Sequence, residues 1–349
     1  MPSFASKFAK KVVRRARKRA GGKFLDVFFR GLSYTGRLMS GVKPEEWGIR
    51  VHRDVPYLGS GSRAHRLDVW SGYEPDRRMP VVFYVHGGGF RILSKDTHWN
   101  FAFSFARLGY VVVTIDYTLS GEKPFPAAVN DLVAAWTWTL DNAERFGGDP
   151  STIIVAGESA GGNLVTALTI MATMERPEAV AQEVFRRGVL PVAVMPACPL
   201  LQVSNPGRFD ELEPDGSAFI RDRLWEVCST YLDDRSASPR PDAALADPIC
   251  ILESDAVTLR PLPPFFSLCG TADLCVHDTR RLAVAVERRG GRCEHPEYPG
   301  QPHAFHALPV LRAARVAWLE QRAFMDSVLG ARVPKALRRL RKKTDKHPR

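Results

Sequence analysis

A serine in a short glycine-flanked motif is the first residue whose setting suggests covalent chemistry. Ser159 is the central residue of Gly157-Glu158-Ser159-Ala160-Gly161, which follows an apolar run and precedes a helical pattern. A sharp strand-to-helix turn presents such a hydroxyl as a nucleophile and requires small residues on either side. The five-letter string arises by chance in about one chain of this length in ten, so its placement carries the prediction. The alternative is a glycine-rich turn with an exposed serine.

A run of three glycines supplies a partner for that serine. His86-Gly87-Gly88-Gly89-Phe90 ends an apolar segment, and glycines allow backbone N–H groups to approach a bound anion closely. The tetrahedral intermediate of acyl transfer needs two or three such donors. We predict that the N–H groups of Gly88, Gly89 and Ala160 form this oxyanion hole, and that His86 orients the loop. A phosphate-binding loop is the alternative, but no Lys follows at the required spacing.

A serine nucleophile also needs a general base and an acid that orients the base. Asp273 and His303 follow two later apolar segments in the order serine, acid, histidine, which is the order used by serine hydrolases with a parallel sheet. Asp278 is an alternative acid and His306 an alternative base. Two further histidines are expected at the surface or around the site, namely His277 and His295.

Short apolar runs alternate with helical patterns along the chain, which predicts a mostly parallel sheet with helices on both faces. The expected strands are Val81–Val85, Val111–Ile115, Thr152–Ala156, Leu190–Met195 and Pro264–Leu268. The expected helices are Thr97–Leu108, Ala127–Phe146, Gly161–Met174, Val276–Arg289 and Leu308–Leu329. The fold class is therefore α/β, and the candidate site residues all follow expected strands.

We divide the 349 residues into a basic tail over 1–23, a catalytic domain over 24–331 and a second basic tail over 332–349. Residues 202–260 interrupt the alternation of strands and helices, and an insertion of this length in a compact sheet is usually functional. Together with residues 24–60 they are predicted to form a helical cap over the site.

The net charge of +11 is concentrated at the two ends of the chain. Residues 1–23 carry +9 and residues 332–349 carry +8, which leaves −6 for the rest. Residues 3–19 fit a basic amphipathic helix, so the tails could attach to an anionic membrane surface; solvated tails are the alternative. No nucleic-acid-binding motif accompanies the charge. The sequence is compatible with a homodimer.

The cysteines indicate a reducing environment. Six are present, and none forms a Cys-x-x-Cys pair or has a histidine at zinc-ligand spacing. No secretory signal is recognised at the basic start of the chain. We therefore expect free thiols, no metal, no cofactor and a cytoplasmic location. The alternative location is peripheral attachment to a membrane through the tails.

The motifs together resemble the hormone-sensitive-lipase-like branch of the α/β hydrolases, over roughly residues 66–330. The resemblance rests on His86-Gly87-Gly88-Gly89-Phe90, Asp116-Tyr117, Gly148-Asp149-Pro150, Gly157-Glu158-Ser159-Ala160-Gly161-Gly162 and His303-Ala304-Phe305. It implies a triad of Ser159, Asp273 and His303, an oxyanion hole of Gly88, Gly89 and Ala160, and a cap. Departures such as Tyr117-Thr118-Leu119-Ser120 and Glu158 leave each catalytic group in place and bear on substrate preference.

The resulting functional hypothesis is a serine esterase that hydrolyses short to medium carboxylic esters through an acyl-enzyme. Two alternatives stay open. An amidase or peptidase would use the same three residues. A non-catalytic binding module on the same scaffold would have lost the serine or the histidine, whereas this chain has kept both.

Overall fold

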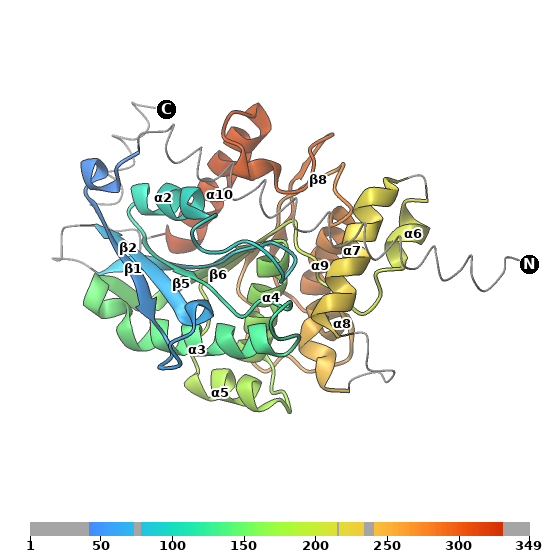
Figure 1. The fold of residues 1–349 in the computed structure, drawn as a ribbon, viewed down its shortest axis with the longest axis horizontal. Helices are drawn as coiled ribbons and strands as arrows, with labels where there is room; N and C mark the ends of the chain where they lie inside the picture. The colour runs from blue at the N-terminus through green and yellow to red at the C-terminus, as the bar shows by residue number, and fades with distance from the viewer. Residues whose placement is uncertain (1–41, 73–77, 215, 234–240, 331–349) are drawn as a thin grey trace, which may run out of the picture.

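A central sheet of eight strands organises the structure, a computed structural model that describes residues 42–72, 78–214, 216–233 and 241–330 (Figure 1). The strand order is β1-β2-β4-β3-β5-β6-β7-β9, and a separate pair joins β10 to β8. The strand β2 is antiparallel to both of its neighbours, and the other pairs are parallel. The bounds are Ile49–Pro56 (β1), Arg66–Gly72 (β2), Met79–Val85 (β3), Val111–Ile115 (β4), Gly148–Glu158 (β5), Ala193–Ala197 (β6), Phe265–Phe266 (β7), Cys269–Gly270 (β8), Cys293–Glu294 (β9) and Glu297–Tyr298 (β10).

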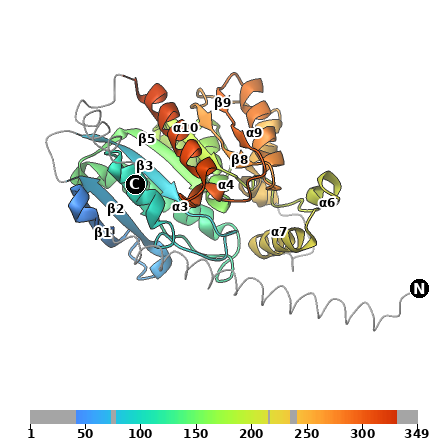
Figure 2. The same ribbon diagram turned by 90° about the horizontal axis from the view of Figure 1, so that it is seen from above.

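Helices cover both faces of this sheet (Figures 1 and 2). The α-helices are Trp99–Arg107 (α2), Ala127–Asn142 (α3), Ala160–Thr173 (α4), Ala179–Arg187 (α5), Arg208–Leu212 (α6), Ala218–Tyr231 (α7), Pro248–Glu253 (α8), Val276–Arg288 (α9) and Arg312–Leu329 (α10). Short 3₁₀ helices are Pro44–Trp47 (η1), Arg63–His65 (η2), Ala143–Phe146 (η3), Pro241–Ala246 (η4) and Phe305–Ala307 (η5). The described part of the chain contains no helix long and apolar enough to cross a membrane.

Alternation along β3 explains why the sheet has two apolar faces. Phe83 and Val85 belong to the core cluster that α3, α4 and α9 complete, whereas Val82 and Tyr84 belong to the cluster that α2 and α10 complete. Successive side chains of a strand point to opposite faces, so a strand buried on both faces reads as an unbroken apolar run. The predicted α/β fold class, a mostly parallel sheet flanked by helices, is confirmed.

The predicted elements agree with the observed ones most closely in the middle of the chain. The strand β4 has the predicted bounds, and α3 continues into η3 as far as Phe146, the predicted end. The strand predicted over Pro264–Leu268 is only the two-residue β7, and β6 begins three residues later than predicted. Strands β1 and β2 and helix α5 were not predicted. Partner strands and packing, rather than local composition, set these limits.

The predicted cap requires a correction at its N-terminal part. Of residues 24–60, the segment Ile49–Pro56 is β1, an edge strand paired with β2 in the central sheet. Only Ile49 of this strand is buried and its other residues are half-buried or exposed, which suits a strand at the edge of the sheet. Residues 24–41 and both basic tails lie outside the described residues. Residues 202–260 form α6, α7, η4 and α8, and α6 and α7 lie at the end of the molecule's long axis opposite β1 (Figures 1 and 2).

Candidate active site

Ser159 occupies the turn between β5 and α4. Its φ of 54° and ψ of −113° lie in a region that non-glycine residues rarely adopt, and the residue is 8% exposed. A Cβ atom on Gly161 would lie 2.1 Å from the carbonyl oxygen of Val85, and one on Gly157 would lie 2.6 Å from the carbonyl oxygen of Gly161. Both positions therefore require glycine. The motif recognised in the sequence is a tight strand-to-helix turn that fixes Ser159.

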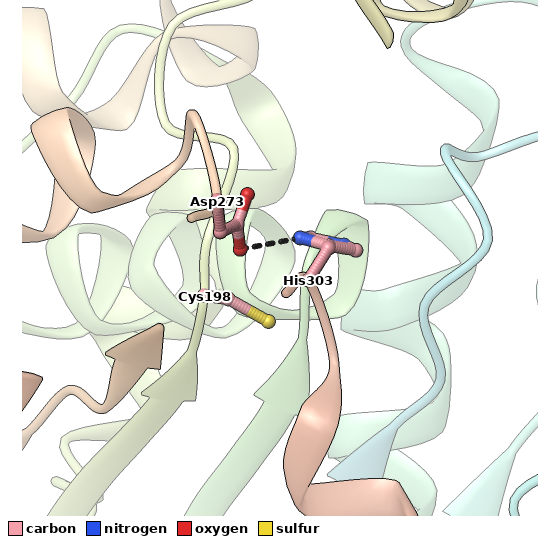
Figure 3. A group of neighbouring side chains, drawn as sticks. All are labelled: Cys198, Asp273 and His303. Atoms are coloured by element: carbon pink, nitrogen blue, oxygen red, sulfur yellow. Dashed lines mark hydrogen bonds and ion pairs between the residues drawn. The ribbon is translucent and has the colours of Figure 1, made fainter. Parts of the chain in front are cut away.

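Asp273 and His303 come together at the same edge of the sheet. The short strands β8 and β10 pair in parallel, with Cys269 opposite Glu297, and the two candidate residues lie in the loops that follow these strands. His303 Nδ1 lies 2.6 Å from Asp273 Oδ2 (Figure 3). This is the hydrogen bond that a catalytic acid makes to orient an imidazole base.

The environment of the pair stabilises its charged form. Burial by itself would raise the pKa of Asp273, but the charge of His303 and the hydrogen bonds from His303, the Cys275 N–H and the Cys269 thiol hold that pKa below its usual value. Partial desolvation of the ring opposes protonation of His303, yet the Asp273 carboxylate raises the pKa of the imidazole well above 6.5. The side chain of His303 is 42% exposed, so a substrate can reach it.

Ser159 and His303 are not hydrogen-bonded to each other. Within the described residues, the Ser159 hydroxyl makes no hydrogen bond to the His303 ring. The backbone N–H of Ser159 donates to the carbonyl of Ala197, 2.9 Å away, which fixes the turn. Catalytic hydrogen bonds are often long or poorly aligned without a substrate and shorten in the reactive complex. The structure therefore shows the acid–base half of the predicted triad as a direct contact.

The glycine loop presents unused N–H groups. Gly88 has φ +106° and Gly89 has φ +58°, both in the left-handed half of the backbone map. In the described part of the chain, neither N–H donates a hydrogen bond to the protein. Ala160 is the first residue of α4, and the first N–H groups of a helix have no partner within the helix. These three donors are therefore free for an oxyanion.

His86 lies beneath the same loop. It is 1% exposed; its Nδ1 lies 2.7 Å from the Gly87 carbonyl oxygen, and its ring stacks on Tyr117 at a centroid distance of 4.3 Å. The Tyr117 hydroxyl donates to the His86 carbonyl at 3.1 Å. A buried ring held on both sides in this way supports the predicted loop-orienting role.

Glu158 and His98 connect the serine turn to the glycine loop, and the sequence analysis did not identify this connection. His98 Nε2 accepts the Gly87 N–H at 3.4 Å and lies 3.7 Å from Glu158 Oε2. Burial would raise the pKa of Glu158, but His98, with smaller contributions from His306 and His303, lowers it to about 2. In the sequence, the one feature that pointed to this connection was the position of Glu158 next to Ser159.

The alternative catalytic residues have other partners. Asp278 Oδ2 accepts the Leu201 N–H at 2.7 Å and an Arg208 N–H at 2.7 Å, so its carboxylate is engaged away from His303. His306 is 2% exposed and packs edge-on against Phe101; burial lowers the pKa of its imidazole to about 4. His277 pairs with Glu213 at 3.1 Å, and His295 is exposed.

Helix α7 packs directly against the glycine loop. Phe90 stacks on Tyr231 at a centroid distance of 3.7 Å, and Arg91 forms an ion pair with Glu226 at 2.9 Å. A Cβ atom on Gly89 would lie 2.5 Å from a methyl group of Val227. The inserted segment 202–260 therefore contacts the candidate oxyanion hole itself.

The comparisons with known proteins agree with this arrangement. A family described as having the alpha/beta hydrolase fold matches residues 82–307. The chain is 27% identical to esterase LipQ of Mycobacterium tuberculosis over 285 residues, which cover 80% of this chain and 63% of LipQ. It therefore spans less than two thirds of the length of that relative.

Two solved structures extend the comparison. An esterase of Pyrobaculum calidifontis is 27% identical, with a TM-score of 0.68 over 88% of this chain and 92% of that chain. An esterase from the bacterial hormone-sensitive lipase family is 26% identical, with a TM-score of 0.62 over 81% of this chain and 86% of that chain.

The chain belongs to the α/β hydrolase fold family. Within that family it is of the hormone-sensitive-lipase-like type, as the motifs predicted, since the family match covers residues 82–307 and the esterase of the bacterial hormone-sensitive lipase family has the same fold at 26% identity.

Proposed function

We propose that this protein is a serine esterase that hydrolyses carboxylic esters of short to medium acyl chain length. The hydrogen bond of 2.6 Å between His303 and Asp273 carries the proposal, because it defines a base with a fixed tautomer at the edge of the sheet where Ser159 is held. The free N–H groups of Gly88 and Gly89 support acyl transfer over simple binding.

The proposed reaction has two acyl-transfer steps. His303 accepts the proton of Ser159 as the hydroxyl attacks the ester carbonyl, and Asp273 stabilises the imidazolium that forms. The N–H groups of Gly88, Gly89 and Ala160 stabilise the oxyanion. His303 then protonates the departing alkoxide and later activates the water that releases the acid.

The names of the relatives support esters rather than amides as the proposed substrates. LipQ and the Pyrobaculum protein are both described as esterases. An amidase or peptidase would use the same residues, so paired p-nitrophenyl butyrate and p-nitroanilide substrates separate the two classes. Greater kcat/KM for the anilide would contradict the ester assignment.

The catalytic assignment is tested by Ser159→Ala and His303→Gln, with His277→Gln as the matched control. We expect the first two variants to lose turnover of p-nitrophenyl butyrate, and Ser159→Ala to lose labelling by a fluorophosphonate probe. His277→Gln should retain both properties, since His277 pairs with Glu213 at 3.1 Å. Full turnover by Ser159→Ala would refute the mechanism, and an unlabelled wild type would favour the non-catalytic alternative.

We also propose that residues 202–260 act as a cap that limits acyl-chain length. Val227 of α7 supports this role, because it lies against Gly89 of the glycine loop. Val227→Ala should shift the preference toward longer esters and Val227→Leu toward shorter ones in a series from acetate to palmitate. Ser229→Ala, on another side of the same helix, is the control. An unchanged profile in both Val227 variants would contradict the assignment.

The basic tails are proposed to attach the protein to anionic membrane surfaces. Their charges of +9 and +8 support this, since each basic residue near such a surface contributes about 1 kcal/mol of attraction. Co-sedimentation with anionic liposomes compares the full chain with residues 24–349. Equal binding of the two would contradict a role for residues 1–23.

A further inference from the structure

Three loops bring a thiol, a carboxylate and an imidazole together beside the sheet. Cys198 follows β6 directly, Asp273 follows β8 and His303 follows β10. One donor atom from each of the three residues lies within 4.8 Å of the other two. Figure 3 shows the sulfur of Cys198 directed toward the pair that Asp273 and His303 form. The thiol is therefore a third member of this cluster.

The backbone holds Cys198 in this orientation. Its φ is +37°, a left-handed conformation that a residue with a Cβ adopts only when its surroundings enforce it. The Cys198 N–H donates to the Leu268 carbonyl oxygen at 2.7 Å, and the residue is 1% exposed. Rotation of the loop away from Asp273 and His303 would break this contact with Leu268, which lies between β7 and β8.

A second thiol approaches the same carboxylate. Cys269 Sγ, in β8, lies 3.4 Å from Asp273 Oδ2, so a second sulfur atom besides that of Cys198 lies near this carboxylate. Thiolate, imidazole and carboxylate are the three donor types that Zn²⁺ prefers in proteins. Tetrahedral Zn²⁺ with bonds of about 2.0–2.3 Å places its donors about 3.5 Å apart. Adjustment of the side chains by about 1 Å brings a 4.8 Å separation close to this value.

We propose that Cys198, Asp273 and His303 form an inhibitory binding site for a thiophilic divalent cation such as Zn²⁺. Binding replaces the proton of the Cys198 thiol, which passes to solvent, by a sulfur–metal bond. Where Nδ1 of His303 is the ligand, the single proton of the neutral ring moves from Nδ1 to Nε2; where Nε2 is the ligand, its lone pair is bound to the metal. In either binding mode, His303 no longer accepts the proton of the serine hydroxyl.

Metal binding at this site regulates the enzyme and is not a step of ester hydrolysis. His303 and Asp273 form the acid–base pair and would also bind the metal. The metal-bound state and the catalytically active state therefore exclude each other. The inhibitory effect rests on the proposed esterase function, whereas metal binding does not. A direct binding measurement therefore separates failure of this inference from failure of the proposed function.

Binding is tested on the reduced full-length protein by titration with Cd²⁺, a thiophilic substitute for Zn²⁺ whose thiolate bonds absorb in the ultraviolet. The wild type should show this absorption with one bound ion, and Cys198→Ser and Cys198→Ala should bind at least tenfold more weakly. Cys250→Ser is the matched control: this half-buried thiol lies in α8, with Asp247, Arg281 and Glu253 as its charged neighbours. Equal affinity of the wild type and both Cys198 variants would overturn the proposal.

Inhibition is then measured as the fraction of each variant's own uninhibited ester turnover. We expect Zn²⁺ to inhibit the wild type and Cys250→Ser, with full recovery after EDTA. At least tenfold more Zn²⁺ should be needed to inhibit Cys198→Ser. Inhibition at the same Zn²⁺ concentration in all three proteins would overturn the inference, as would Cd²⁺ binding that leaves turnover unchanged.

Discussion

Replacing Asp273 by asparagine changes the proposed catalytic acid to an amide of nearly the same shape. Asp273 Oδ1 accepts the backbone N–H of Cys275 at 3.0 Å, and Oδ2 accepts His303 Nδ1 at 2.6 Å. The fixed N–H of Cys275 requires an oxygen in front of it, so the amide oxygen of the asparagine must occupy that position. The amide NH₂ group then faces His303 and donates to Nδ1. The imidazole consequently carries its proton on Nε2, where it cannot accept one from Ser159.

The expected loss follows from this change of tautomer. In a serine protease, the same exchange of acid for amide lowers kcat about 10⁴-fold, which corresponds to about 5 kcal/mol of transition-state stabilisation. The Cys275 N–H makes the wrong orientation the favoured one here as well, since the opposite orientation would place two donors face to face. We therefore expect a loss of about 10⁴-fold in kcat and little change in KM.

The assay is turnover of p-nitrophenyl butyrate, normalised to the folded fraction. Asp278→Asn is the matched control, because Asp278 is the alternative acid and its carboxylate binds Arg208 and the Leu201 N–H. That variant should lose stability through its weakened buried ion pair and keep kcat within tenfold. The assignment of the acid would be refuted if Asp273→Asn kept more than one tenth of the wild-type kcat. It would also be refuted if Asp278→Asn lost more kcat than Asp273→Asn.

Two further predictions concern the serine turn and the base. Gly161→Ala should lower the free energy of unfolding by at least about 1–3 kcal/mol, because its Cβ would lie 2.1 Å from the carbonyl oxygen of Val85. Gly121 has open space around it, so Gly121→Ala should not change the denaturant midpoint. Equal midpoints for the two variants would contradict the packing argument. The kcat/KM profile should have an acid limb with its midpoint above pH 6.5, because Asp273 raises the pKa of His303 and only the neutral imidazole accepts a proton. In Asp273→Asn the residual activity should show this midpoint at lower pH, and an unshifted limb would contradict the electrostatic coupling.

Local sequence patterns were sufficient for the centre of the fold but not for its edges. The strand β4 is apolar at nearly every position because helices cover both of its faces, and its predicted bounds were correct. The edge strand β1 has one buried residue, Ile49, and includes Arg50, Arg53 and Asp54, so its composition resembled a loop. Its strand conformation depends on pairing with β2, which lies outside its own sequence.

The candidate site divides in the same way. The Asp273–His303 contact was predictable because the order of parallel strands places the loops that follow them at one edge of the sheet. The approach of Cys198 to that pair was not, because it depends on the left-handed backbone at Cys198 and on the hydrogen bond from its N–H to the Leu268 carbonyl. Residues 198, 273 and 303 are far apart along the chain, and no spacing rule connects them.

The packing of α7 on residues 89–91 would link the proposed selection of substrates by this helix to the rate of their conversion. The stack of Phe90 on Tyr231 and the pair of Arg91 with Glu226 bind the helix to the backbone that carries the proposed oxyanion donors. A displacement of α7 that admits a bulkier ester would therefore also shift those donors. Directed evolution of this protein toward larger substrates should accordingly select compensating changes in the loop together with changes in the helix.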